Sequence, residues 1–304
     1  MSVSTLIRET TFAGHPDMIW VAGGTFLMGS DAFYREERPA RPASVEGFWI
    51  DRTPITNAEF AMFVAATHYV TVCERQPDAA MYPDADPALL VPGSAVFRQP
   101  TGPVSLGDSR AWWEYVPGAN WRHPQGQGSS IEGSDDHPVV HVSYEDACAY
   151  AAWVGKALPT EAEWEFAARG GLEGAAYAWG DEPMLDGHFM ANTWQGRFPW
   201  ENLALDGHAG TSPVDAFPAN GYGVYDMIGN VWEWTTTRFD SAKSSCCGAG
   251  GGAPQFARNV VKGGSHLCAP NYCLRYRPAA RQGEAIDTST SHIGFRCIVR
   301  PNSA

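Results

Sequence analysis

The sequence predicts a mixed α+β fold in which loops outnumber regular elements, and its length allows one large domain or two ordinary ones. Its 304 residues include 32 glycines and 22 prolines, which interrupt helices and strands, and 12 tryptophans, which supply large packing surfaces. Helix-capping signals are few, and the β-branched and aromatic runs between turns are short. We therefore expect short elements held together by aromatic packing. The chain is long enough to bury a sizeable core without disulfides.

Three helices are expected from their capping signals. Thr56 and Thr160 each precede a glutamate by three residues, the Ser/Thr-x-x-Glu capping box in which two backbone N–H groups are satisfied reciprocally. Ser143 is a third candidate N-cap. Glycines at 155 and at 170–171 are placed to end the second and third helices.

Short strands are expected where β-branched and aromatic residues are bounded by Gly or Pro. The expected strands are Met18 to Val21, Thr25 to Met28, Ser44 to Ile50, Val139 to Val142, Val260 to Lys262 and Gly294 to Val299. Residues 244–252, which include Cys246 and Cys247, have the composition of a flexible surface loop.

Charge and hydropathy exclude several classes of partner. The formal net charge is −13 without any long Lys/Arg run, which argues against binding to nucleic acid or to an anionic membrane. A solvated acidic surface, a basic peptide ligand and bound divalent cations all remain open. No apolar segment approaches the roughly 20 residues of a membrane helix, and the N-terminus lacks the pattern of a secretion signal. Because the seven cysteines show no disulfide-framework spacing, we expect a cytoplasmic protein.

Common enzyme motifs are missing. There is no phosphate-cradling Gly-x-x-x-x-Gly-Lys, no Gly-x-Ser-x-Gly elbow and no His-Glu-x-x-His zinc helix. The nine histidines are scattered. His137 and His141 flank an expected strand, where hydrogen-bonded structural histidines are expected rather than ligands.

The chemistry is expected in residues 263–277, which contain Cys268 and Cys273. The guanidinium groups of Arg275 and Arg277 favour thiolate, the form that binds soft metals or attacks disulfides. However, the spacing Cys-x4-Cys is neither the Cys-x-x-Cys of redox motifs nor the doubled pairs of a zinc site. From the residues alone, a disulfide, two inert buried thiols, a redox pair and a metal site all remain open.

The chain resembles the formylglycine-generating enzymes of the sulfatase-modifying-factor family, bacterial type. The motifs that carry the resemblance are residues 22–29 (AGGTFLMG), 54–57 (PITN), 137–143 (HPVVHVS), 158–165 (LPTEAEWE), 192–196 (NTWQG), 229–234 (GNVWEW), 263–277 and 294–297 (GFRC). The resemblance implies one domain over residues 1–304, with 1–17 as a flexible N-terminal extension. It also implies a loop-rich fold related to C-type-lectin-like domains.

The activity implied by the resemblance is that of an oxidase. It would use molecular oxygen and a thiol reductant to convert a cysteine, in a Cys-x-Pro-x-Arg motif of an unfolded or nascent sulfatase polypeptide, to Cα-formylglycine. Cys268 and Cys273 match the family's catalytic thiols and would hold Cu(I), a soft ion suited to two close thiolates. The enzyme is expected to be a monomer.

Further site residues follow from the same resemblance. Ser265, Trp232 and Tyr272 match positions that line the family's oxygen and substrate pocket, although without the resemblance they fit a turn residue, a core residue and a packing aromatic. Substrate-binding positions are Arg275, Arg277 and His292, and the two arginines are equally plausible as a structural pair. The family usually has Asn in place of His292 and often His in place of Ala269, so substrate preference or protonation steps are expected to differ here.

The resemblance also implies two structural Ca2+ sites. The first would be formed by Asn192, Thr193, Asp206 and His208, with main-chain oxygens from Thr193 and His208, and the second by Asp226, Gly229, Val231 and Glu233. Closely spaced oxygen ligands from loops are what Ca2+ requires.

The cysteines separate this chain from the secretory members of the family. Their additional structural cysteines correspond to Ala151, Ala168 and Pro278 here, so Cys297 has no partner and is expected to be a reduced core residue. The main alternative function is a non-catalytic peptide- or ligand-binding member of the same superfamily, a class that lacks the thiol pair. An iron enzyme of the ergothioneine-synthase type would need a helical domain with a histidine cluster, which the sequence lacks.

Overall fold

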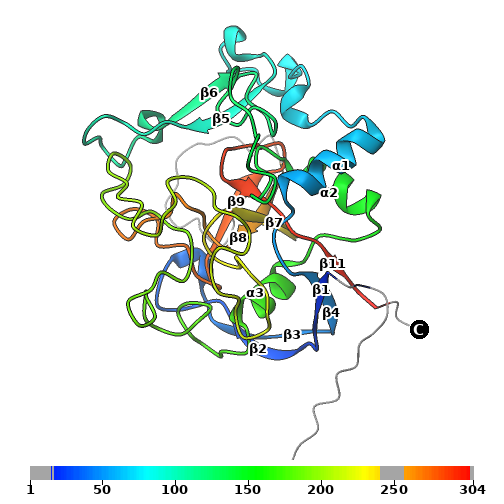
Figure 1. Cartoon of the computed structure of the whole chain (residues 1–304), viewed down its shortest axis with the longest axis vertical. Helices are drawn as coiled ribbons and strands as arrows, with labels where there is room; N and C mark the ends of the chain where they lie inside the picture. The colour runs from blue at the N-terminus through cyan, green and yellow to red at the C-terminus, as the bar shows by residue number, and fades with distance from the viewer. Residues whose placement is uncertain (1–14, 16, 240–256, 302–304) are drawn as a thin grey trace, which may run out of the picture.

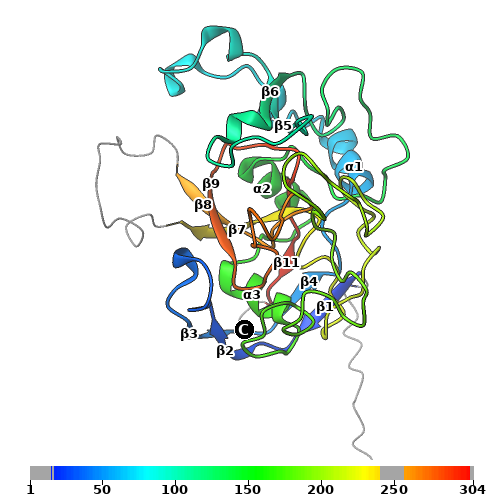
Figure 2. The same ribbon diagram turned by 90° about the vertical axis from the view of Figure 1, so that its left-hand side faces the viewer.

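The computed structural model describes residues 15, 17–239 and 257–301. Most of the expected N-terminal extension, together with Cys246 and Cys247, lies outside these residues. The β5–β6 hairpin lies at one end of the molecule and the β2–β3 pair at the other, with the β7–β9 strands between them (Figure 1, Figure 2). None of the helices in the described ranges is long and apolar enough to span a bilayer.

The three expected helices are confirmed. They are α1 (Asn57–Thr67), α2 (Tyr144–Trp153) and α3 (Glu161–Arg169). Thr56 and Thr160 form the expected capping boxes, and Ser143 forms a further box with Asp146. Gly170 ends α3 in the left-handed conformation at φ 56°. Local capping therefore determines where these helices begin and end.

Within the described residues the strands form four small sheets. Their orders are β1–β4–β11, β10–β7–β8–β9, β2–β3 and β5–β6. The strand bounds are β1 Met18–Val21, β2 Gly24–Met28, β3 Arg41–Val45, β4 Phe48–Asp51, β5 Gly93–Phe97, β6 Trp113–Pro117, β7 Trp232–Arg238, β8 Arg258–Lys262, β9 Arg281–Ala285, β10 Ile293–Gly294 and β11 Ile298–Val299. Short 3₁₀ helices lie at Arg35–Glu37, Val72–Glu74, Ala79–Met81, Pro87–Leu89 and Ser109–Ala111.

Some expected strands are confirmed and others are wrong. The strands at 18–21, 25–28 and 260–262 are present, whereas the one expected over 44–50 is broken between β3 and β4. The break includes Gly47, where a Cβ would lie 2.6 Å from the Trp20 ring. The segment 294–299 is likewise divided between β10 and β11.

The segment Val139 to Val142 is not a strand. Its apolar residues are buried, but its backbone does not pair along one neighbouring strand. Val139 N donates to Ile55 O, and His141 N donates to Thr290 O. His141 has φ 59°, which interrupts an extended chain. His141 is hydrogen-bonded to Ser94 and Pro124, and His137 to Thr211, as expected for structural histidines.

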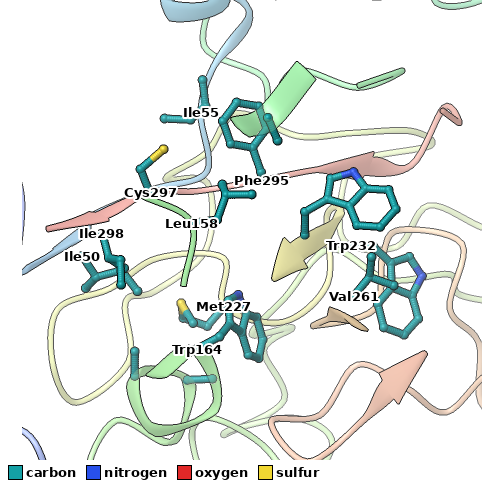
Figure 3. Packing of buried hydrophobic residues seen from close by; sticks show 14 of the residues in the cluster. Ile50, Ile55, Leu158, Trp164, Met227, Trp232, Val261, Phe295, Cys297 and Ile298 are labelled. Atoms are coloured by element: carbon teal, nitrogen blue, oxygen red, sulfur yellow. The ribbon is translucent and has the colours of Figure 1, made fainter. Parts of the chain in front are cut away.

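The main core lies between the central sheet, α3 and the C-terminal strands. Trp164, Trp232 and Phe295 pack there with aliphatic residues from several elements (Figure 3). Cys297 lies fully buried in this core, as expected, and is bonded to no other cysteine in the described ranges, while its reduced state stays a prediction. This core supports the loop that follows β8, where the thiol pair lies.

Candidate active site

The loop after β8 brings the two cysteines together. Gly264 has φ 72°, and a Cβ there would lie 2.9 Å from the Arg275 carbonyl oxygen, so glycine permits this close approach. Cys268 N donates to Ser265 O at 2.9 Å, and Cys273 N donates to Ala269 O at 2.9 Å. These turns place the two Sγ atoms 3.1 Å apart as free thiols, which is well beyond a disulfide bond length.

The two thiols differ in acidity. A hydrogen bond from Cys268 and the charge of Arg275, whose Nη1 lies 3.8 Å from the Cys273 Sγ, hold the pKa of Cys273 below its usual range. Burial and the neighbouring Cys273 raise the pKa of Cys268. The pair is therefore arranged as a Cys273 thiolate that accepts a hydrogen bond from the Cys268 thiol.

Arg275 is held by a segment from the N-terminal part of the chain. Its guanidinium lies 3.9 Å from the Tyr34 ring centroid, and its Nη2 donates to Glu36 Oε1 at 2.6 Å. The Tyr34 hydroxyl accepts a hydrogen bond of 2.9 Å from Leu274 N. Tyr34 and Glu36 were not predicted, because no local sequence pattern links them to the cysteine loop.

Arg277 is not part of the site surface. Its side chain is buried in an ion pair with Glu37, donates to Leu274 O at 2.8 Å and lies 3.7 Å from the Phe33 ring centroid. A direct contact with substrate, as implied by the resemblance, would require this ion pair to break. The geometry instead favours the structural alternative for Arg277.

A cavity of about 180 Å³ opens on the thiol pair. The sequence-predicted residues that line it are Cys268, Cys273, Ser265, Trp232, Tyr272, Arg275 and His292. Residues that were not predicted are Trp112, Trp113, Phe198, Leu267 and Gln282. The adjacent Trp112 and Trp113 were the one sequence feature that could have indicated an aromatic wall of the site. Only the fold of the β5–β6 hairpin brings them to the cysteines.

Aromatic rings form one part of the cavity wall. Tyr272 stacks on Phe198 with ring centroids 4.6 Å apart and contacts Trp112 edge-on at 5.4 Å. Trp113 packs against the His292 ring at 4.8 Å, and the Trp232 backbone N–H donates to His292 O at 2.9 Å. These walls limit the access of water to the thiols.

His292 is neutral in this packing. Burial and the nearby His266 and His141 lower the pKa of His292 to about 3. Its Nδ1 is 2.7 Å from Thr290 Oγ1. A neutral imidazole can exchange a hydrogen bond with a substrate without adding a positive charge beside Arg275.

The residues of the first expected calcium site lie together. Asp206 Oδ2 accepts from Thr193 N at 3.3 Å, and Oδ1 accepts from His208 N at 3.0 Å. Asn192 is buried, and its Oδ1 has no hydrogen-bond partner within the described part of the chain. An unpartnered buried oxygen on Asn192, next in sequence to the residue that bonds to the Asp206 carboxylate, fits a bound cation.

The second expected calcium site fits only in part. Asp226 is buried, its Oδ1 has no hydrogen-bond partner among the residues described, and burial raises its pKa to about 7. In contrast, both Glu233 oxygens accept from Arg296 at 2.7 Å, and Oε2 also accepts from Trp164 Nε1. Within residues 15, 17–239 and 257–301 there is no group of three or more His, Cys, Asp or Glu side chains arranged to hold a metal. A cation at either site would therefore need main-chain and amide oxygens in addition to the carboxylate of Asp206 or Asp226.

Alkylation of the metal-free protein is expected to depend on pH at Cys273. The pKa of this thiol, lowered to about 7 chiefly by the Cys268 hydrogen bond, means that the thiolate fraction rises as pH increases through neutrality. Iodoacetamide labelling between about pH 5 and pH 9, followed by peptide mass mapping, measures this dependence. Cys73 is the internal control, because burial raises its pKa to about 12. Equal labelling rates at Cys73 and Cys273 would contradict the assignment.

Comparisons with known proteins agree with this geometry. The chain matches the family described as Sulfatase-modifying factor enzyme 1-like domain over residues 3–301. A Mycobacterium tuberculosis relative named "Formylglycine-generating enzyme" is 54% identical over 297 residues, covering 94% of this chain and 99% of the relative. A Mus musculus relative named "Inactive C-alpha-formylglycine-generating enzyme 2" is 40% identical over 290 residues, covering 94% of this chain and 86% of the relative.

A solved structure extends the likeness to the fold. PvdO from Pseudomonas aeruginosa matches with a TM-score of 0.63 at 23% identity, over 93% of this chain and 94% of that chain. This likeness concerns the fold alone. The family match over residues 3–301 and the 54% identity to the mycobacterial enzyme show that the chain belongs to the sulfatase-modifying factor family, that of the formylglycine-generating enzymes.

Proposed function

We propose that this protein is a formylglycine-generating enzyme, which oxidises a cysteine in a Cys-x-Pro-x-Arg motif of a sulfatase polypeptide to Cα-formylglycine. The observation that carries the proposal is the pair of free thiols 3.1 Å apart, which line a cavity together with aromatic residues. A non-catalytic family member would not need a thiol of lowered pKa that lines a cavity. Molecular oxygen is the proposed oxidant, and a thiol supplies the remaining electrons.

The donor set of the thiol pair fits Cu(I). Cys268 and Cys273 offer two soft sulfur ligands, and the acidity of Cys273 favours the deprotonated form that a metal needs. When bound, Cu(I) would supply the redox chemistry with oxygen and a position for the substrate thiolate. Arg275 would balance the negative charge of the thiolates, and Glu36 would keep Arg275 in place.

The electrons balance when two thiol groups of the reductant are oxidised to one disulfide for each substrate cysteine. The substrate CH2SH loses two hydrogens to become a thioaldehyde, and water then replaces sulfur to give the aldehyde and H2S. Oxygen is reduced to water with these two electrons and two more from the thiol reductant, which becomes a disulfide. The walls formed by Trp112, Phe198 and Tyr272 would limit the contact of bulk water with the reacting sulfur.

Calcium is proposed as a structural cation at the site of Asn192, Thr193, Asp206 and His208. The support is the unpartnered buried Asn192 Oδ1, together with the Asp206 carboxylate that accepts from the backbone of the neighbouring Thr193. The second site, around Asp226, is proposed on the same ground with main-chain oxygens of Gly229 and Val231, and Glu233 would have to share its carboxylate with Arg296.

Protein purified without chelator is expected to contain calcium, and its removal is expected to lower the melting temperature. A cation that binds only the folded state stabilises it by about 2.7 kcal/mol at one hundred times its Kd. Elemental analysis and thermal melts with and without added Ca2+ measure both effects. Absence of calcium together with an unchanged melting temperature on adding it would reject this proposal. Asp206→Asn is the variant that should weaken the calcium response while leaving the thiols intact.

The function is tested by mass spectrometry of a Cys-x-Pro-x-Arg peptide incubated with the protein, oxygen, a thiol reductant and Cu(I). Conversion of CH2SH to CHO that requires copper is the expected result. A metal-free reaction is the control. Absence of both conversion and copper binding would favour a non-catalytic peptide-binding function instead. A monomeric state and a cytoplasmic location remain predictions.

A further inference from the structure

A second and larger cavity lies beside the thiol cavity. Its volume is about 690 Å³, within the range of ligand and peptide side-chain sites, and we name it the distal cavity. Its lining includes the apolar or aromatic residues Val72, Met81, Tyr82, Leu89, Leu90 and Tyr115. Met81 and Leu89 are 39% and 46% exposed, so a ligand in this cavity would remove apolar surface from water.

One face of the β5–β6 hairpin contributes residues to both the thiol cavity and the distal cavity. Ala95 pairs with Tyr115 and Phe97 with Trp113, so these four side chains share a face. Trp113 lines the thiol cavity, whereas Ala95 and Tyr115 line the distal cavity. Two residues along a strand span about 7 Å, so the two cavities are neighbours on this face.

The segment 287–292 connects the same two cavities by a second route. Ser289 lines the distal cavity and His292 lines the thiol cavity. The segment is held beside β5 because Ala95 N donates to Ser289 O and Ser291 N donates to Ala95 O. The β5–β6 face and the 287–292 segment therefore place the distal cavity close to the thiols that a substrate cysteine would reach.

The charge around the distal cavity favours a basic partner. The acidic lining residues are Asp78, Glu145 and Asp287, and the one cation among the lining residues, Arg75, bonds to Glu145. Asp287 Oδ2 accepts one hydrogen bond, from the Tyr82 hydroxyl at 2.6 Å, so its negative charge is not neutralised by that contact.

We propose that the distal cavity binds a segment of the sulfatase polypeptide that flanks the Cys-x-Pro-x-Arg core. It would take an apolar side chain against Met81 and Leu89, next to a basic side chain near Asp78 and Asp287. This inference rests on the proposed function, since it takes the same polypeptide as substrate. It adds a recognition site outside the five-residue core.

The test compares a core peptide with peptides extended on either side by an apolar and a basic residue. Extension on one side is expected to raise kcat/KM by about tenfold, the effect of burying one apolar side chain. The variant Met81→Gln/Leu89→Gln is expected to lose this gain while converting the core peptide as before. The matched control is Met184→Gln/Leu185→Gln, whose original side chains are 37% and 46% exposed and line neither cavity.

A second variant tests the charge. Asp78→Asn/Asp287→Asn is expected to remove the preference for the basic residue and to reduce the dependence of kcat/KM on salt. The inference is overturned if core and extended peptides are converted equally well, or if both Gln variants lose the gain. It is also overturned if sedimentation shows a dimer that Met81→Gln/Leu89→Gln dissociates, because a second copy would then occupy the cavity.

Peptide binding separates this inference from the proposed function. If the unaltered protein converts no peptide, the proposed function fails, and fluorescence anisotropy with labelled core and extended peptides still tests the cavity. Tighter binding of the extended peptide, lost in Met81→Gln/Leu89→Gln, would keep the recognition site. Equal binding of both peptides would reject it.

Discussion

Replacing Cys268 or Cys273 with Ser is expected to lower peptide conversion by on the order of a thousandfold or more. A hydroxyl is a hard and weakly acidic group that cannot substitute for a thiolate as a Cu(I) ligand. The two sulfur atoms lie 3.1 Å apart, so loss of either one leaves a single soft ligand. Conversion measured by mass spectrometry and Cu(I) affinity measured by competition with a chromophoric chelator are expected to fall together.

Cys148→Ser is the matched control for this prediction. Cys148 is a free, partly buried thiol on α2 and does not line the cavity. Its replacement is expected to leave both conversion and Cu(I) affinity unchanged. Thermal melts of all three variants establish that each is folded. Aldehyde formation at the original rate by Cys268→Ser would show that the proposed mechanism is wrong.

Replacing Arg277 with Met is expected to destabilise the protein by about 3–5 kcal/mol, the range for breaking a buried ion pair by removing one partner. Arg277 and Glu37 are both buried, and the change would leave the Glu37 carboxylate without its counter-charge. Denaturant unfolding monitored by tryptophan fluorescence measures the loss. The effect should appear as a lower midpoint with an unchanged slope.

The double variant Glu37→Leu/Arg277→Met distinguishes a structural role from substrate binding. Replacing both charges with apolar groups removes the unpaired carboxylate, so much of the lost stability is expected to return. Activity of the folded double variant should then also return. If Arg277→Met instead keeps its stability and loses only kcat/KM, the substrate-binding role implied by the family resemblance is right.

Parts of the fold that depend on near neighbours in sequence were predictable. The capping boxes join residues three positions apart, so Thr56 and Thr160 identified the starts of α1 and α3. The strand over 139–142 was wrong for the opposite reason. Its apolar residues are buried, but its backbone N–H groups donate to Ile55 and Thr290 rather than to a neighbouring strand, and hydrophobicity alone does not distinguish these environments.

In the candidate site, too, the features that depend on near neighbours in sequence were predictable and those that depend on distant segments were not. Cys268 and Cys273 were identified from their motif, and the turns that join their thiols are local. The prediction that both nearby arginines act at the site did not separate Arg275 from Arg277. Their difference arises from Tyr34, Glu36 and Glu37, which reach them only in the folded chain.

The sequence by itself determined the family, the three capped helices and the thiol pair. Each of these depends on short motifs of residues that are close together along the chain. Only the tertiary structure decided that Arg275 faces the cavity while Arg277 is buried, and that the β5–β6 hairpin supplies Trp113 to the thiol cavity and Tyr115 to the distal cavity. The physical reason is that side-chain pairing across distant segments depends on how the sheets and loops pack. That packing is a property of the whole chain rather than of any local pattern.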